Sequence, residues 1–472
     1  MRECKKRWVF LLLCLLAVLV LPACGEDQLP PDPEEGVLVF AALNPQDKTI
    51  KMRVDLFNKS HEDVQIEMRD YSGEEGRQRF LVELMAGQVP DIMELHYFGA
   101  AGEILPYDAP GVTERPADEF WLPYRQLVQK GYLEDLWPYI ENDPQLGRDA
   151  MLEPPLKAAE INGSLYIAFQ KVRINTLSGD ESVVGARYGW TFDQLMEAFA
   201  TMPEDSTVLR YNTTKWEVYS KLLCYSLSEY VDWQTGECFF DSEAFRNMLE
   251  FLNGFPDEVE EESPYKTDEE VVWRILKGRQ MLEGVQIAWP SNILYINTLW
   301  QGRAAFVGYP TAEGRSGSVF YPTGSIMAMS STCRDKEAAW EFIAPLFRPR
   351  YKMTTVLAAN VNIPVNLRDY ETLIRANFNE SQATDWDARQ PMPPWPHFRA
   401  GPEIVPTSPL TEEDVQQYRD LVNSVTQFYW PDDDLADIVW DSCGSYFAGD
   451  RTMDDTVRLL NNRVGLYVNE QR

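Results

Sequence analysis

The sequence has 472 residues and a formal net charge of −31, with 74 acidic against 43 basic side chains. A chain this acidic is repelled by nucleic acid and by anionic lipid head groups, which excludes nucleic acid as a partner. Apolar residues make up 44% of the chain, which indicates a folded globular protein long enough for more than one domain.

The start of the chain has the pattern of a secretory signal. Basic residues precede an apolar run over 8–20, and the sequence Leu-Pro-Ala-Cys follows, ending at Cys24. This ending resembles the lipobox of bacterial lipoproteins, in which the cysteine is acylated and becomes the mature N-terminus, although Pro22 departs from the usual Ala or Ser. An uncut transmembrane anchor is the alternative, but the run is short for a span of roughly 20 residues. We expect a signal peptide over 1–23, a lipidated flexible spacer over 24–36, and attachment to the outer side of the cell membrane.

An α/β unit follows the spacer. The apolar run over 37–40 is typical of a strand buried on both faces. Asn44 and Pro45 suit the start of a helix that ends at Phe57. A second strand over 64–68, a second amphipathic helix and a third strand continue the alternation, which predicts an α/β fold.

Later segments carry local structural signals. The pair Asn162-Gly163 between two apolar runs predicts a tight turn. Thr191 and Asp335 are suitable N-caps for two amphipathic helices. Six prolines over 391–406 predict a loop without regular structure.

Four cysteines lie beyond Cys24, at 224, 238, 333 and 443, and none is in a CxxC motif. Cys224 and Cys238 flank a short polar stretch, so a disulfide between them is compatible with an oxidising compartment. Scattered buried thiols are equally compatible with the spacing. The sequence leaves both alternatives open.

Several segments resemble one protein family in their order and spacing. Besides the lipobox, they are FNKSHEDVQIEMRDYS, LMAGQVPDIMEL, KGYLEDLWPYI, INGSLYIAF, WTFDQLMEAF, RAAFVGYPT, GSIMAMSSTCRDKEAAWEFI and YFAGDRTMDDTVRLLNNRVGLYVNEQ. Together they resemble the extracellular solute-binding proteins of bacterial ABC importers, specifically the large sugar-binding lipoproteins. The resemblance implies a two-lobe, periplasmic-binding-protein-like α/β fold with a hinge and an interlobe ligand cleft. By similarity, lobe 1 spans 37–169 and 323–361, and lobe 2 spans 170–322 and 362–472, with crossovers at GSLYIAF, FYPTGS and NIPVN.

The same resemblance implies the partners. They are a carbohydrate ligand, the permease subunits of an ABC transporter and, through the lipid, the membrane. A monomer without cofactor or metal is expected. A binding protein for another solute, such as a peptide, is an alternative within the same class.

Ligand residues are expected on loops beyond the carboxyl ends of strands, where α/β sheets place them. Sugars present apolar ring faces and many hydroxyls, so their sites combine aromatic with hydrogen-bonding side chains. The candidates of this kind are Asn44, Tyr71, His96, Tyr97, Gln170, Trp233, Tyr309, Ser325 and Trp395. The same loops hold Leu43, Arg173, Trp289, Trp300, Gly324 and His397. Tyr309 and Trp395 are favoured, because most of the 14 tryptophans are expected in the core.

Catalytic motifs give no support to an enzyme. The three histidines form neither HExxH nor HxH, and the sequence holds no GxSxG elbow and no GxxxxGK loop. A glycosidase needs only two carboxylates, which any acidic chain can supply. We therefore expect a binding protein and retain a surface-anchored glycan hydrolase as the rival from another class.

Overall fold

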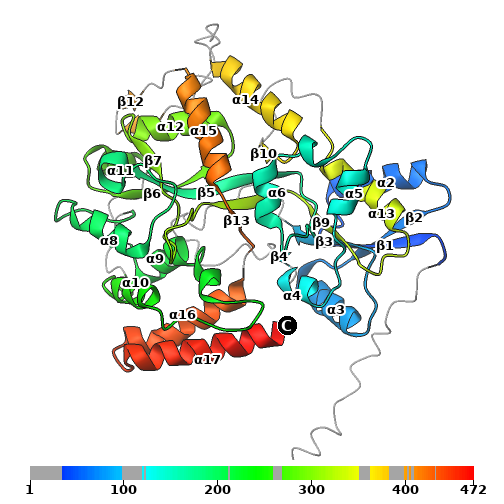
Figure 1. Ribbon diagram of the computed structural model, residues 1–472, viewed down its shortest axis with the longest axis horizontal. Coiled ribbons are helices and arrows are strands. Elements are labelled where there is room, and N and C mark those ends of the chain that lie inside the picture. The colour runs from blue at the N-terminus through cyan, green and yellow to red at the C-terminus, as the bar shows by residue number, and fades with distance from the viewer. Residues whose placement is uncertain are drawn as a thin grey trace, which may run out of the picture.

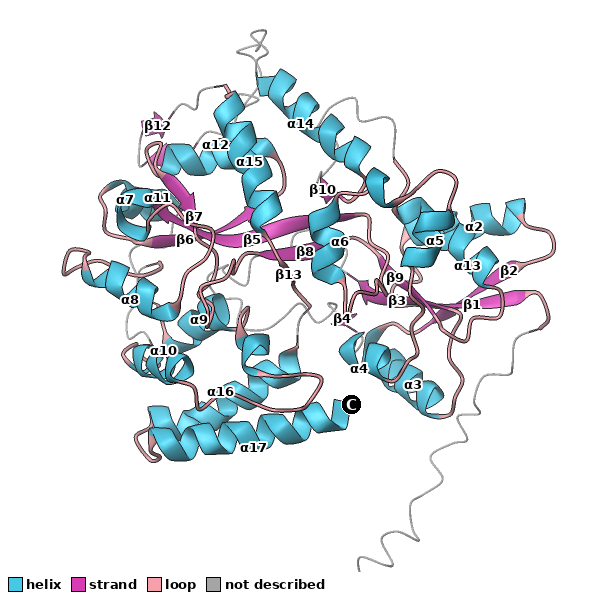
Figure 2. Ribbon diagram, viewed as in Figure 1, coloured by secondary structure: helices cyan, strands magenta, loops and turns pink. Residues whose placement is uncertain are grey.

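Two β-sheets lie side by side in this mixed α/β protein, each covered by helices (Figure 1, Figure 2). The computed structural model describes residues 34–97, 120–121, 124–210, 213–258, 268–349, 362–381, 398–400, 403–405, 409–430 and 432–471. The α/β fold class expected from the alternation of strands and helices is confirmed.

The first sheet has the order β2-β1-β3-β4, with β9 also paired to β3. Its strands are β1 (Val37–Ala42), β2 (Gln65–Asp70), β3 (Ile92–Tyr97), β4 (Phe120–Trp121) and β9 (Ile326–Met329). β1 runs parallel to β2 and β3, whereas β4 and β9 run antiparallel to β3. Five consecutive residues of β1 are buried, as expected for a strand covered on both faces.

Helices α2 (Lys48–Ser60) and α3 (Gly73–Met85) connect the first three strands and lie on opposite sides of the sheet in Figure 1. The N-cap of α2 is Asp47, whose carboxylate accepts from the backbone of Thr49 and Ile50 at 2.6 and 3.0 Å. The expectation that Asn44 caps this helix is wrong. Its side chain accepts from the backbone N–H of Gln46 at 3.2 Å, so it stabilises the turn that precedes the helix.

The second sheet has the order β10-β5-β8-β13, with β6 and β7 also paired to β5. Its strands are β5 (Lys171–Asp180), β6 (Leu282–Ile287), β7 (Ala304–Phe306), β8 (Val319–Thr323), β10 (Ile363–Pro364) and β13 (Gln427–Phe428). Every strand that pairs with β5 is antiparallel to it, and β13 runs parallel to β8. β5 is the long central strand on which this sheet is built.

The remaining helices divide between the two sheets (Figure 1). Near the first sheet are α4 (Tyr124–Gln129), α5 (Trp137–Asn142), α13 (Lys336–Ile343) and η4 (Ala344–Leu346). The short helices η1 (Arg148–Ala150) and α6 (Glu153–Ala159) lie between the sheets, where η1 contacts α14 and α6 contacts β13. Around the second are α7 (Glu181–Val184), α8 (Phe192–Ala200), α9 (Lys215–Val218), η2 (Tyr219–Leu223), η3 (Leu227–Tyr230), α10 (Glu243–Asn253), α11 (Asp268–Leu276), α12 (Pro290–Leu299), α14 (Leu367–Ser381), α15 (Glu412–Ser424), α16 (Asp433–Phe447) and α17 (Met453–Gln471). We call the first sheet with α2–α5 and α13 the first lobe, and the second sheet with α7–α12 and α14–α17 the second lobe.

Several local predictions are confirmed. Asn162 and Gly163 adopt φ values of 54° and 83°, as a tight turn of this kind requires. Thr191 caps α8 in a capping box with Gln194, and Asp335 caps α13. The irregular loop predicted over 391–406 is wrong in part. A short hairpin of β11 (Phe398–Ala400) and β12 (Glu403–Val405) forms there, because the prolines fall outside both strands.

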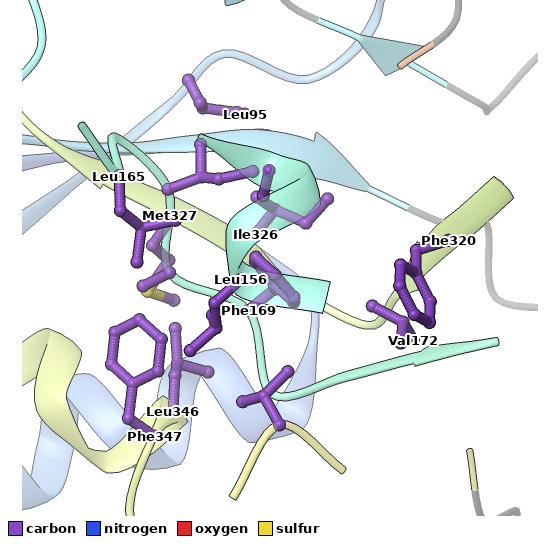
Figure 3. Packing of buried hydrophobic residues seen from close by; sticks show 14 of the residues in the cluster. Leu95, Leu156, Leu165, Phe169, Val172, Phe320, Ile326, Met327, Leu346 and Phe347 are labelled. Atoms are coloured by element: carbon purple, nitrogen blue, oxygen red, sulfur yellow. The ribbon is translucent and has the colours of Figure 1, made fainter. Parts of the chain in front are cut away.

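Two apolar cores lie on opposite faces of the second sheet. The larger core continues from the first sheet onto one face of the second, joining Leu95 and Met327 of the first to Val172 and Phe320 of the second (Figure 3). The smaller core packs α8, α10, α16 and α17 against the other face, where Leu177 and Val319 lie. The four described cysteines, including Cys224 and Cys238, are free thiols.

Candidate functional site

The chain passes between the two sheets at a narrow crossover. Ala168 pairs with Met327 of the first sheet, and three residues later Lys171 pairs with Thr323 of the second. Gly324 lies between β8 and β9 with φ 85°, a conformation that other residues rarely adopt. Side chains near these positions are therefore within reach of both lobes.

On the first sheet, the buried acid Glu94 forms hydrogen bonds with residues at the ends of neighbouring strands. Glu94 of β3 is 1% exposed, and its carboxylate accepts from the backbone N–H groups of Leu43 and Asn44 at 2.9 and 3.2 Å. The Ser325 hydroxyl donates to its other oxygen at 3.1 Å. Burial raises the pKa of Glu94 to about 7, although these three donors act in the opposite direction. Three sequence-predicted residues thus meet around an acid that the sequence did not single out.

On the second sheet, the strand face near the crossover is polar and aromatic. Arg173 and Asn175 alternate along β5 and so point to the same face, where the register sets Tyr321 of β8 opposite Arg173. The Arg173 guanidinium lies 4.8 Å from the Tyr321 ring centroid. The Asn175 amide donates to the Tyr225 hydroxyl at 3.5 Å.

Four tyrosine rings extend from this face in a continuous series, which we call the tyrosine ladder. Tyr321 stacks on Tyr429 with centroids 5.5 Å apart, and Tyr429 lies 4.8 Å from Tyr225. Tyr225 in turn stacks on Tyr309 at 4.0 Å and an interplanar angle of 9°. The four rings come from four separate segments, so the ladder links parts of the second lobe that are far apart in sequence.

Some buried polar atoms within the second lobe and between the two lobes have no hydrogen-bond partner among the residues that the structure describes. Asn175 is 5% exposed, and its Oδ1 is one such atom. Tyr124 Oη and Trp233 Nε1 are two others, and the Tyr124 ring packs 4.7 Å from Trp430, the residue after Tyr429. A buried polar group without a partner is costly unless a ligand or water supplies one. The arrangement therefore suits a ligand with both hydroxyl groups and apolar faces.

Other sequence-predicted residues have structural contacts. Tyr71 is 1% exposed, packs edge-on to Phe80 and donates its hydroxyl to Glu83, inside the first lobe. The backbone carbonyl of Gln170, a half-buried residue, accepts from Val365 at 3.0 Å. Trp233 carries the guanidinium of Arg125 on its ring face at 4.7 Å.

Two tryptophans from the same loops pack in the second lobe. Trp300 is buried and donates to the Ser178 hydroxyl at 3.0 Å. Trp289 precedes α12 and packs beside Leu373. Neither takes part in the ladder.

The remaining candidates are placed only in part or not at all. His96 and Tyr97 end β3, where their backbones pair with Trp121 and Phe120 of β4. Trp395, His397 and Cys24 lie outside the described residues. Within the described part of the chain, no group of three or more His, Cys, Asp or Glu side chains could hold a metal ion.

Most of the residues on the polar and aromatic face of the second sheet were not predicted from the sequence. Asn175, Tyr225, Tyr321 and Tyr429 were not among the candidates, whereas Tyr309 and Arg173 were. One local signal existed, because the aromatic run from Phe428 to Trp430 ends a strand beside a polar face. The others become neighbours only through strand register.

A family model and several solved structures match the chain. The family model described as bacterial extracellular solute-binding protein matches residues 41–353. The solved structure of the sugar-binding protein MalE from Xanthomonas citri is 14% identical, covers 92% of this chain and 98% of its own, and superimposes with a TM-score of 0.50. A family 1 extracellular solute-binding protein from Alicyclobacillus acidocaldarius is 11% identical, covers 93% and 100%, and has a TM-score of 0.46. No curated protein sequence matches the chain.

Proposed function

The chain belongs to the family of bacterial extracellular solute-binding proteins, and on this premise we propose that it captures an extracellular sugar or oligosaccharide between its lobes and delivers it to the permease of an ABC transporter. The family is one of binding proteins. In this proposal the ligand leaves the site unaltered, and the two-lobe fold supplies closure around it.

The tyrosine ladder, with Arg173 and Asn175 beside it, is the observation that carries the proposal. Aromatic ring faces stack on the apolar faces of sugar rings, while amide and guanidinium groups bind hydroxyls. The unpartnered Oδ1 of Asn175 is an acceptor for a hydroxyl donor. A peptide would instead be expected to bind through backbone-like hydrogen bonds along a strand edge.

The first lobe completes the proposed site from the other side of the crossover. Asn44 and Ser325 are hydrogen-bonded to Glu94 there, and we retain His96 and Tyr97, the last two residues of β3, as proposed ligand residues. We retain Gln170 and Trp395 as proposed ligand residues. The lobe boundaries stay as proposed from the resemblance, at 37–169 with 323–361 and 170–322 with 362–472.

Thermal shift measurements against a panel of sugars and peptides test the ligand class. A bound ligand raises the melting temperature by mass action, so a sugar or oligosaccharide should raise it and peptides should not. A shift with peptides alone would replace the proposed class. Chromatography of the recovered ligand distinguishes the binding protein from the alternative of a glycan hydrolase, because cleavage products would appear only if the protein is an enzyme.

We also propose that the mature protein is a monomer tethered by fatty acids on Cys24, with 24–36 as a flexible spacer to the membrane. Among the described residues, no helix combines the length and the apolarity that crossing a bilayer requires. Fatty-acid labelling of wild type and of Cys24→Ala tests the tether. Label should be incorporated in the wild type and lost in the variant, and label in neither would contradict it.

A further inference from the structure

A second set of contacts joins the lobes away from the tyrosine ladder. In the second lobe, Val231 pairs with Cys238 around a tight turn that Asp232 stabilises by accepting from two backbone N–H groups at 2.8 and 3.1 Å. Trp233 and Gln234 lie in this turn. Their partners lie within 37–169, the segment that the resemblance assigns to the first lobe.

Helix α4 provides the main partners. The guanidinium of Arg125 lies 4.7 Å from the Trp233 ring centroid, and Gln129 donates from Nε2 to the Trp233 carbonyl at 3.1 Å. Arg125 and Gln129 are four residues apart and so share one face of the helix. α4 is anchored in the first lobe by its buried Leu127 and by the following Leu133, which pairs with Ser330 beyond β9.

A third contact uses the predicted tight turn. Gln234 donates from Nε2 to Oδ1 of Asn162 at 2.7 Å. Asn162 adopts a positive φ, so its side chain is presented from a fixed backbone conformation. We call Arg125, Gln129, Asn162, Trp233 and Gln234 the interlobe clasp.

The second lobe also carries the charge that opposes Arg125. Asp432 lies just before α16 and accepts from the Tyr467 hydroxyl of α17 at 2.7 Å. Burial raises the pKa of Asp432, whereas the positive charge of Arg125 acts to lower it. Figure 1 shows the C-terminal end of α17 beside α4.

We propose that the interlobe clasp holds the two lobes together in the absence of ligand, and that Trp233 acts as a positioning residue for closure rather than as a ligand-stacking residue. All clasp contacts run from one lobe to the other, and none involves the tyrosine ladder. Because Arg125 covers one face of the Trp233 ring, a sugar ring cannot stack on that face while the clasp is formed. The proposal concerns the lobes alone, so it does not depend on the ligand being a sugar.

The size of the effect follows from the contacts. A partly buried cation–π contact of about 0.5–2 kcal/mol corresponds to a roughly two- to thirtyfold change in the ratio of open to closed molecules. Removing the clasp should therefore shift the ligand-free protein toward an open arrangement.

Small-angle X-ray scattering of the ligand-free protein tests this. The double variant Arg125→Ala with Gln129→Ala should have a larger radius of gyration than wild type, and Gln129→Ala alone a smaller increase in the same direction. Lys130→Ala is the matched control, because it removes an exposed cation next to α4 that makes none of the clasp contacts. Circular dichroism confirms that each variant is folded.

Trp233→Ala tests the clasp independently from the side of the second lobe, and it should also increase the radius of gyration. A radius of gyration equal to that of Lys130→Ala in both the double variant and Trp233→Ala would overturn the proposal. Should the double variant fail to fold, Gln129→Ala and Trp233→Ala decide the outcome. No ligand is added, so a failed sugar panel and a failed clasp are distinguishable.

Discussion

The two sheets differ in how fully their buried polar groups near the crossover are hydrogen-bonded. In the first sheet, the Glu94 carboxylate accepts from Leu43, Asn44 and Ser325 at 2.9–3.2 Å. In the second, Asn175 makes one long hydrogen bond and keeps an unpartnered Oδ1 within the described structure. A buried polar cluster whose hydrogen bonds are all made holds its residues in a fixed geometry. A buried polar atom without a partner gains more free energy when a ligand supplies the missing hydrogen bond. Within the proposed function, we therefore expect the first sheet mainly to fix the geometry of the site and the second sheet to contribute most of the affinity for the ligand.

Removing the first ring of the ladder should have the largest effect. In Tyr321→Ala, loss of ring contact with the ligand and with Arg173 should raise the Kd by roughly thirtyfold, as for a buried aromatic contact of about 2 kcal/mol. Isothermal titration with the ligand from the sugar panel measures it. Tyr139→Ala is the control, since that ring packs on Trp340 in the first lobe. Equal Kd values in both variants would contradict a role of the second sheet in recognition.

A smaller effect is expected at Asn175. Asn175→Ala removes a hydrogen-bond acceptor, so the Kd should rise about fivefold, in line with one net hydrogen bond. The melting temperature of the ligand-free protein should stay unchanged or rise, because an unpartnered polar atom has been removed from the interior.

Ser325→Ala makes the reciprocal test in the first sheet. It should lower the melting temperature and raise the Kd less than Asn175→Ala does, because its hydroxyl is already engaged by Glu94. If Asn175→Ala lowered stability while Ser325→Ala weakened binding more, the roles of the two sheets would be reversed.

A separate test is a pH dependence of stability that comes from Glu94. Its pKa is about 7 in the folded protein against an ordinary value of 4.5, so the folded state binds more protons between these values. This contribution to stability is fully present below pH 4.5 and is lost as pH rises through 7.

Melting temperatures from pH 4.5 to 8 check this dependence. The difference between wild type and Glu94→Gln should change across the window, because the variant cannot titrate at this position. Ser325→Ala keeps the acid and should retain a titration in the window. Parallel curves for wild type and Glu94→Gln would show that Glu94 does not titrate there.

Local signals predicted much of the fold. The apolar run at β1, the Asn162-Gly163 turn and the Thr191 cap each depend on neighbouring residues, and each forms as expected. The sequence assigned the cap to Asn44, but Asp47 lies directly before the helix and caps it. Local composition does not rank two candidate caps that are three positions apart.

The candidate site was harder to predict, because its partners are distant in sequence. Asn44 and Ser325 were placed at strand ends, but Glu94, which joins them, sits inside an apolar strand that looks like core. Tyr225 and Tyr429 are about 200 positions apart and meet only because β13 pairs with β8. Tyr71 also follows a strand, yet its ring turns into the interior to reach Glu83.

The larger core, which continues from the first sheet onto one face of the second, has a consequence for how the molecule melts. Since both lobes contribute to it, the first lobe has no core separate from that of the second lobe within the described part of the chain. The separable layer is the helices beneath the second sheet, where the smaller core lies. The boundary between cooperative units thus lies within the second lobe. In hydrogen exchange, the helices around the smaller core should exchange as one group, and the second sheet should exchange together with the first lobe.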